Sequence, residues 1–216
     1  MLIPCDNLPK NGARLKEAVT VFAGQSDHDL ARWIHDNLQC PSTMVDSITP
    51  ATDDALRARV AEATGVADAW PIQREAFTQW VIEKHTHDNG PDWQGVGVTI
   101  TDNVPAYERA KLRLLNGPHS TLAYMGLHRG YDSVSEAMQD TELADIVRRL
   151  MTLDVVPLLD APEGLDLMAY SEDILKRFRN PAIVHKLAQI AWDGSQKLPI
   201  RILSSLSEAL DRGQDI

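Results

Sequence analysis

The sequence is poor in cysteine and in long apolar runs. Two cysteines occur among its 216 residues, Cys5 and Cys40, and neither has a second cysteine or a histidine at the spacing of zinc ligands. We therefore expect free thiols and no metal site. No apolar run approaches the ~20 residues of a membrane span, and the N-terminus lacks the basic and apolar regions of a signal peptide. These absences favour a cytoplasmic protein that has no membrane partner.

Basic residues are in the minority. Lysine and arginine number 21 against 31 aspartates and glutamates, a formal net charge of −10, and no basic cluster stands out. Because binding to a phosphate backbone needs clustered positive charge, this balance disfavours nucleic acid and anionic lipid as partners. With 44% hydrophobic residues, the rest of the composition is typical of a globular protein that holds its core without disulfides.

A nucleotide-binding glycine motif is also missing. The 12 glycines form neither G-x-G-x-x-G nor G-x-x-x-x-G-K-[ST], the turns that cradle phosphates. Gly95-Val-Gly97 comes nearest, but no glycine or alanine stands at a useful position after it, as far as Thr101. The absence predicts that any cofactor-binding domain lies outside these residues.

Hydrophobic periodicity predicts a mainly α chain with minor β segments, in residues 43–48 and 96–100. Ser26, Thr52 and Ser171 are expected to cap helices, and Gly65 to end one. The sequence His85-x-His87-Asp88 offers no third metal ligand and is interpreted as a solvated loop. Helices are predicted at residues 27–38, 53–64, 73–84, 105–128, 133–153, 171–179, 182–193 and 202–211.

One lysine departs from the usual amphipathic pattern. On a helix through residues 104–115, Lys111 falls within the apolar stripe, whereas Arg109 and Arg113 fall on the opposite, solvent-facing side. Burial disfavours the charged form of an amine, which suits a lysine to accept a proton near neutral pH. The alternative is that Lys111 lays its methylenes on the edge of the core and extends its ammonium into water.

The residues after Lys111 favour the chemical role. Asn116 and His119 follow five and eight positions later, and Gly117-Pro118 between them should kink or restart the helix, leaving backbone groups unpaired. A base, an amide donor and an imidazole together are typical of a site that oxidises an alcohol or reduces a carbonyl.

The segment from Lys111 to Ser120 resembles the signature of the mannitol dehydrogenase and fructuronate reductase family, the long-chain polyol and hexuronate dehydrogenases. Further blocks resemble that family in the same order along nearly the whole chain: Cys5-Asp6-Asn7-Leu8-Pro9-x-Asn11-Gly12, Val45-Asp46-x-Ile48-Thr49-Pro50, Glu75-x-Phe77-x-Gln79-Trp80-Val81, Arg177-Phe178-x-Asn180-Pro181 and Asp193-Gly194-Ser195-Gln196-Lys197.

The resemblance implies a metal-independent, NAD-dependent oxidoreductase, with NADP as an alternative cofactor. It also implies that residues 1–216 are one helical C-terminal catalytic domain of the 6-phosphogluconate dehydrogenase type. The N-terminal Rossmann domain, which binds most of the cofactor, would be absent from this chain and would act as a separate partner. The isolated chain would then be inactive. Lys111 would be the general base, Asn7 and Asn116 would stabilise the developing alkoxide, and His119 and Asp46 would hold substrate hydroxyls.

The substrate is expected to be a sugar alcohol or a hexonate, of the mannitol/fructose or mannonate/fructuronate type. Gln189 stands where mannitol-specific members have arginine, which favours the mannonate branch, and Lys197 and Arg201 are candidate partners of a substrate carboxylate. Asp154 stands where we expect glutamate.

Plain structural interpretations remain for several of these residues. Asn7 can be a turn residue, Asp46 a strand-end cap, and Lys197 a cation at a helix C-terminus. The alternative function is a non-catalytic, stand-alone helical domain that binds a sugar acid or a partner polypeptide.

Overall fold

The computed structural model describes residues 1–85 and 91–214. Contacts divide the chain into two compact units: unit 1 comprises Met1–Ser47 and Phe77–Glu108, and unit 2 comprises Ile48–Ala76 and Arg109–Ile216. The expectation that residues 1–216 form one folding domain stays a prediction. No helix in the described part of the chain is both long and apolar enough to cross a membrane.

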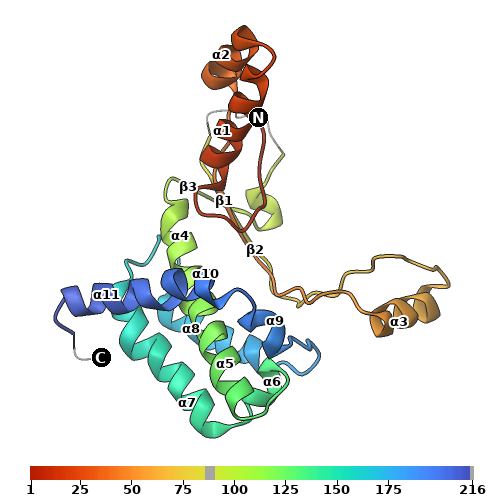
Figure 1. The fold of residues 1–216 in the computed structure, drawn as a ribbon, viewed down its shortest axis with the longest axis vertical. Coiled ribbons are helices and arrows are strands. Elements are labelled where there is room, and N and C mark those ends of the chain that lie inside the picture. The colour runs from red at the N-terminus through yellow and green to blue at the C-terminus, as the bar shows by residue number, and fades with distance from the viewer. Residues whose placement is uncertain (86–90, 215–216) are drawn as a thin grey trace. The chain divides into compact units, whose positions relative to one another are not determined.

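Unit 1 is built on a three-stranded sheet of order β1-β2-β3 (Figure 1). Strand β1 runs antiparallel to the central strand β2, and β2 runs parallel to β3. Val81 and Ile82 of β2 are fully buried and form the centre of the unit 1 core. The elements of unit 1 are α1 (Asn11–Gly24), α2 (His28–Asn37), β1 (Thr43–Asp46), β2 (Gln79–Glu83), η1 (Gln94–Val96) and β3 (Thr99–Thr101), followed by α4 (Val104–Lys111), which leads into unit 2.

Two elements of unit 1 differ from the sequence expectation. The helix predicted at 73–84 is wrong, because β2 occupies 79–83 as the central strand, where a continuous apolar run suits burial on both faces. Helix α1 was not expected. It starts after Lys10, which adopts a left-handed conformation (φ 54°) and makes no capping hydrogen bond from its side chain, so the usual start signal is missing.

The first turn of α1 packs closely against the chain that enters β1. A Cβ on Gly12 would lie 2.3 Å from the Cys40 carbonyl oxygen, far inside contact distance. Asn11 completes the junction, because its Nδ2 donates to the Thr43 carbonyl at 3.0 Å and its Oδ1 accepts from the Thr43 N–H at 2.8 Å. The same Nδ2 donates to the Asp6 carbonyl at 3.0 Å, which fixes the N-terminal loop beside β1.

Replacing Gly12 with alanine should therefore destabilise the protein by about 1–3 kcal/mol, because backbone must move to admit the methyl group. Gly24→Ala in the same helix is the matched control: its Cβ would meet only the Ala31 side chain at 3.6 Å, an ordinary contact. Urea unfolding checks the pair, and an equal stability of the two variants would contradict the close packing.

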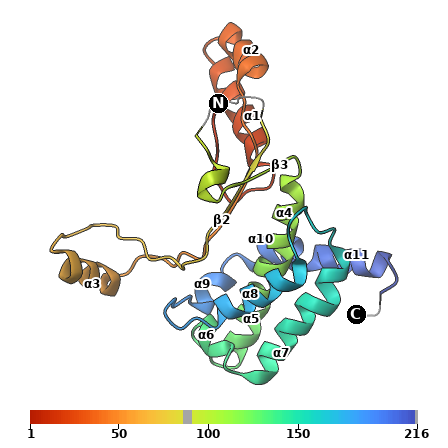
Figure 2. The ribbon, with the colours of Figure 1, turned by 180° about the vertical axis from the view of Figure 1, so that it is seen from behind.

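Unit 2 is helical, with α5 in contact with α6, α7 and α9 (Figure 1). Helix α8 lies behind this group in Figure 1 and in front of it in Figure 2. The largest fully buried side chains of unit 2 include Leu114, Leu122, Leu143, Ile174 and Phe178. Its elements are α3 (Asp54–Thr64), η2 (Leu112–Asn116), α5 (Gly117–His128), α6 (Val134–Ala137), α7 (Thr141–Arg149), η3 (Leu150–Val155), η4 (Val156–Leu158), α8 (Leu167–Phe178), α9 (Leu187–Ala191), α10 (Gly194–Leu198), η5 (Pro199–Leu203) and α11 (Ser204–Asp211).

The sequence predicts which segments of unit 2 are helical better than it predicts where each helix begins. The end of α3 at Gly65, in the left-handed conformation, is confirmed. The prediction that Ser26, Thr52 and Ser171 cap helices is wrong. In each case a nearby aspartate side chain accepts the first N–H groups of the helix instead. The observed capping residues are Asp27 for α2, Asp53 for α3 and Asp166 for α8.

The predicted break at Gly117-Pro118 takes the form of a wide turn. Residues Leu112–Asn116 form a π-helical segment in which the Gly117 N–H bonds the Leu112 carbonyl, and the chain stays helical on both sides. Pro118 lies in the first turn of α5, where its missing N–H costs little.

The expectation that Arg113 faces solvent is wrong. Its exposed fraction is 8%, and its Nη2 lies 2.6 Å from Oε2 of Glu208 in α11. The wide turn begins at Leu112, so the α-helical rotation of 100° per residue used for the projection no longer applies beyond it. Arg109, which precedes the wide turn, is exposed as predicted.

Candidate functional site in unit 2

Lys111 is buried at the junction of α4 and η2. It is the last residue of α4, and its exposed fraction is 7%. The neighbouring side chains Ala110, Leu114 and Leu115 are at most 3% exposed, so the apolar surroundings expected from the periodicity are present. The Lys111 side chain is therefore enclosed and does not extend into water.

Asn116 ends the π-helical segment, one turn from Lys111 along the chain. Asn116 is half-buried, and its backbone carbonyl accepts a hydrogen bond from the Ser120 hydroxyl at 3.2 Å. Because a π turn inserts one extra residue into the helix, it rotates the residues after it relative to Lys111. Such single wide turns within helices are frequent at functional sites.

His119 is enclosed by aromatic and cationic groups of unit 2. Its ring stacks on Phe178 of α8, with centroids 4.3 Å apart and an interplanar angle of 27°. His185 meets it edge-on at 5.2 Å and 85°. Its exposed fraction is 6%, and its Nε2 has no hydrogen-bond partner in the part of the chain that the structure describes.

The surroundings keep the His119 imidazole neutral. Burial lowers its pKa well below the usual 6.5, and the electrostatic effects of His185, Arg177 and Arg201 lower it further. Burial also lowers the pKa of His185. A neutral His119 retains one nitrogen that donates and one that accepts a hydrogen bond, which suits contact with a hydroxyl group.

These shifts predict that acid destabilises the protein. Below a pH of about 6.5 the unfolded chain binds protons at His119 and His185 that the folded chain does not, so stability falls as pH falls, by up to about 1.4 kcal/mol per pH unit for each histidine. Urea unfolding at about pH 7 and about pH 5.5 measures this slope. His119→Asn should flatten it, and His128→Asn, at an exposed position of the same helix, should leave it unchanged. Equal slopes in all three proteins would contradict the neutral His119.

A buried ion pair supports the ring that stacks on His119. Arg177 immediately precedes Phe178, and its Nε and Nη2 donate to the Glu75 carboxylate at 3.0 and 2.7 Å. The exposed fractions of the two side chains are 8% and 4%. Glu75 also accepts from the Ile48 N–H at 2.6 Å, so segment 48–76 is fixed to the end of α8. Both residues stand in sequence blocks that resemble the family, but the sequence alone predicts no role for either.

Arg201 reaches the same region from η5. Its Nη1 donates to the hydroxyl of Ser120, the residue after His119, at 3.2 Å. Gly117 permits the approach, since a Cβ there would lie 2.9 Å from the Arg201 carbonyl oxygen. The Arg201 guanidinium is half-buried, and burial lowers its pKa from the ordinary value. The structure thus brings together His119 and Arg201, for which the sequence predicts separate roles.

Gln189 and Lys197 lie on either side of a tight connection between α9 and α10. Gln189 is exposed and Lys197 is half-buried. Between them Asp193 is left-handed (φ 58°), and a Cβ on Gly194 would lie 2.0 Å from the Tyr124 hydroxyl, which donates to the Ala191 carbonyl at 2.8 Å. Tyr124 of α5 therefore fixes the connection that separates the two candidate residues.

Asn7 and Asp46 belong to unit 1. Asp46 ends β1 and is 3% exposed, and Asn7 lies exposed in the N-terminal loop that Asn11 fixes to β1. Their grouping with the residues of unit 2 stays a prediction. Among the described residues no group of three metal-ligating side chains occurs, and His87 and Asp88 of the sequence His85-x-His87-Asp88 lie outside those residues.

Family models divide the chain in two. The model described as the mannitol dehydrogenase C-terminal domain matches residues 103–216, and the model described as the mannitol dehydrogenase Rossmann domain matches residues 1–95. The first alone covers more than half of the sequence. The chain belongs to the mannitol dehydrogenase family. Unit 1 falls largely within the Rossmann match, and residues 109–216 of unit 2 fall within the C-terminal match.

The Rossmann match overturns the expectation that this domain is absent and is a separate partner. A Rossmann domain consists of many strands and helices, and the glycine fingerprint marks one of its βα turns. The lack of that fingerprint in residues 1–95 therefore said nothing about the domain's other elements. With this correction, the reason for expecting an inactive isolated chain also falls away.

Individual relatives include polyol and hexonate enzymes. D-mannonate oxidoreductase of Escherichia coli (strain K12) is 41% identical over 98% of this chain and 44% of its own length. Mannitol dehydrogenase DSF1 of Saccharomyces cerevisiae is 40% identical over 97% of this chain and 42% of its own length. The structure of Pseudomonas fluorescens mannitol 2-dehydrogenase in ternary complex with NAD and D-mannitol matches 99% of this chain and 43% of that chain, with 39% identity and a TM-score of 0.85. The chain thus spans less than half the length of these relatives.

Proposed function

We propose that the protein is an NAD-dependent oxidoreductase that interconverts a secondary alcohol and a ketone on a sugar alcohol or a hexonate, without a metal. The observation that carries the proposal is the arrangement along α4, η2 and α5. A buried lysine and a buried, neutral histidine flank a π-helical turn that ends in Asn116. The relatives named for mannitol and mannonate support the same chemistry.

In this proposal Lys111 is the general base. Its neutral amine takes the proton of the substrate hydroxyl as the alcohol carbon loses its hydride to NAD. Asn116 and Asn7 donate hydrogen bonds to the oxygen, on which negative charge develops in the transition state. Neutral His119 holds a neighbouring hydroxyl, and Asp46 holds another.

NAD is the proposed hydride acceptor, with NADP as the alternative. The 216 residues contain no G-x-G-x-x-G turn to cradle a pyrophosphate, so no residue of this chain is assigned to the cofactor. The residues proposed here act on the substrate alone: they bind its hydroxyls, hold its proton and orient its reacting carbon.

The charges of unit 2 favour a hexonate over a neutral polyol. Arg201 and Lys197 are both half-buried cations, and Arg201 uses Nη1 on Ser120, which leaves its other donors for a carboxylate. Gln189 stands where mannitol-specific members of the family have arginine, which also favours the mannonate branch. We therefore propose mannonate as the first substrate to test, ahead of mannitol and arabinitol.

A substrate panel tests the function. Reduction of NAD is followed by absorbance with D-mannonate, D-mannitol and D-arabinitol, and reduction of NADP is measured in parallel. We expect turnover with at least one of these compounds, with mannonate highest. Absence of turnover with all three, combined with calorimetric binding of mannonate that is unaffected by NADH, would favour the non-catalytic sugar-acid domain instead.

A further inference from the structure

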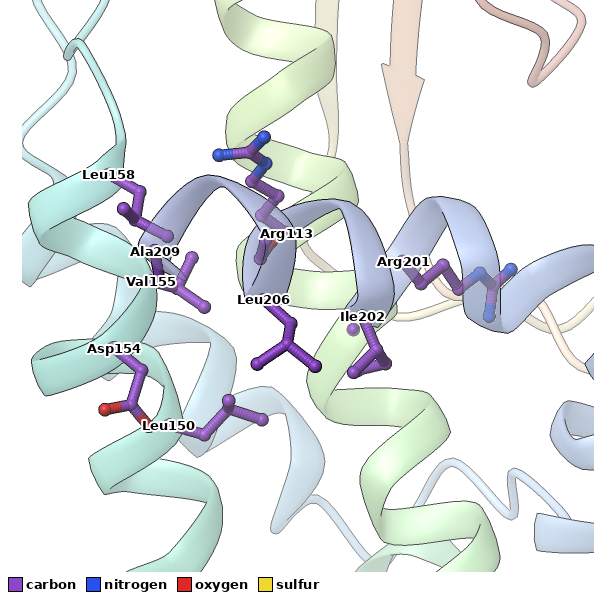
Figure 3. A pocket seen from close by; sticks show the side chains of 11 residues that line it. Arg113, Leu150, Asp154, Val155, Leu158, Arg201, Ile202, Leu206 and Ala209 are labelled. Atoms are coloured by element: carbon purple, nitrogen blue, oxygen red, sulfur yellow. The ribbon is translucent and has the colours of Figure 1, made fainter. Parts of the chain in front are cut away.

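The Arg201 guanidinium lies apart from the apolar pocket that its own helix helps to form. Arg201 belongs to the wall of a pocket lined by parts of η2, η3, η4, η5 and α11, in which the other side chains are mainly apolar. In Figure 3 the Arg201 side chain extends away from the other labelled side chains. Its charged end therefore lies where Nη1 meets Ser120, and not in the apolar pocket.

The Ser120 hydroxyl joins Arg201 to Asn116. It donates its proton to the backbone carbonyl of Asn116 at 3.2 Å, and its oxygen accepts a hydrogen bond from Arg201 Nη1 at 3.2 Å. A serine hydroxyl has one proton and two lone pairs, so the bond to Asn116 leaves only lone pairs for the guanidinium. Ser120 is 2% exposed, so this oxygen is shielded from competing water.

The backbone of Arg201 is held close to the same turn. A Cβ on Gly117, the residue after Asn116, would lie 2.9 Å from the Arg201 carbonyl oxygen. The near end of Arg201 is thus fixed by backbone packing, but an arginine side chain has many rotamers, and holding one of them costs free energy. The contact with Ser120 fixes the far end, so it sets where the guanidinium lies relative to Asn116.

The contact with Ser120 leaves a matched pair of donors on Arg201. Within the described part of the chain the guanidinium bonds Ser120 through Nη1 and forms no ion pair. Nε and Nη2 remain, and they lie side by side in the plane of the guanidinium, an arrangement that suits the two oxygens of a carboxylate. Arg177 uses the same two nitrogens on the Glu75 carboxylate.

We propose that Ser120 is a positioning residue that selects for an acid substrate. By holding Nη1, it presents Nε and Nη2 of Arg201 to the carboxylate of a hexonate, at a fixed place relative to Asn116, which acts on the reacting oxygen. A neutral polyol gains nothing from this arrangement, because it has no carboxylate. The proposal rests on the proposed function, since it takes a hexonate as the substrate of unit 2.

Ser120→Ala tests the proposal through steady-state reduction of NAD by the purified full chain. The KM for D-mannonate should rise at least about fivefold, because Arg201 loses the hydrogen bond that holds it. The kcat for mannonate, and the KM for whichever of D-mannitol and D-arabinitol the parent oxidises, should change less than about twofold. An unchanged KM for mannonate, or an equal rise for the acid and the neutral substrate, overturns the proposal.

Thr121→Val is the matched control. The Thr121 hydroxyl donates to the Gly117 carbonyl at 3.3 Å, one residue further along the same turn. The variant therefore removes a similar hydrogen bond without removing the partner of Arg201, and mannonate and the neutral substrate should behave as with the parent. A rise in the KM for mannonate equal to that of Ser120→Ala assigns the effect to the helix as a whole and overturns the proposal.

A double variant and a binding measurement separate the positioning role from the reaction. Because Ser120 acts through Arg201, Ser120→Ala should have no further effect on mannonate in an Arg201→Met background, and additive effects overturn the proposal. Calorimetric titration with mannonate gives the same comparisons without turnover. If no substrate is oxidised, weaker mannonate binding by Ser120→Ala than by Thr121→Val supports the positioning role and contradicts the reaction. Turnover that is equal in these two variants does the reverse, and the absence of both turnover and mannonate binding overturns both.

Discussion

Lys111→Met is expected to lower turnover by a factor of about 10²–10⁴, the usual contribution of a positioned acid or base. Methionine retains the length and the apolar stem of lysine, so it fits the buried position beside Leu114 and Leu115 without a cavity. The loss should therefore fall on the catalytic step, with substrate affinity little changed. Steady-state kinetics with the best substrate of the panel separate kcat from KM.

Lys176→Met is the matched control for this experiment. Lys176 is exposed on α8, where it pairs with Asp173, and its removal should leave turnover as it was. Lys111→Ala provides a second readout, because added small amines should restore part of the activity if the missing group is a base. Turnover of Lys111→Met within a factor of about two of the parent, or the absence of any amine rescue, assigns the proton transfer to another residue.

The sequence was most informative where one local pattern decides the structure. The buried position of Lys111 followed from the spacing of apolar residues, and the end of α3 followed from the left-handed preference of Gly65. Both are local properties that neighbouring segments did not override.

Other features depend on contacts between distant residues. Strand β2 pairs with two strands that no local pattern identifies as its neighbours, so its apolar run was mistaken for part of a helix. The stacking of His119 on Phe178 joins residues far apart in the chain, and it rests on the equally remote contact of Arg177 with Glu75. Because of the π turn after Lys111, Arg113 is buried and pairs with Glu208, whereas the helical projection predicts an exposed position. A helical projection could not predict these contacts, because each depends on a residue that is distant in the sequence and close only in the folded chain.

Glu75→Gln is expected to destabilise the protein by about 3–5 kcal/mol, the cost of breaking a buried ion pair by removing one charge. The glutamine retains the size of the side chain but removes the carboxylate that faces the buried Arg177 guanidinium. Because Arg177 precedes Phe178, the change should also disturb the ring that stacks on His119 and so reduce turnover. Urea unfolding and steady-state kinetics measure the two effects.

The double variant Glu75→Leu, Arg177→Met distinguishes a required charge pair from a required fold. Replacing both members of a buried pair with apolar residues is often neutral or stabilising, so stability should recover relative to Glu75→Gln. The His119 imidazole also loses one of the positive charges that lower its pKa, so its pKa should rise toward the ordinary value, which NMR titration detects. Asp173→Asn, which removes an exposed pair from the same helix, should change neither property. If Asp173→Asn and Glu75→Gln destabilise the protein equally, the buried pair does not have the role assigned to it.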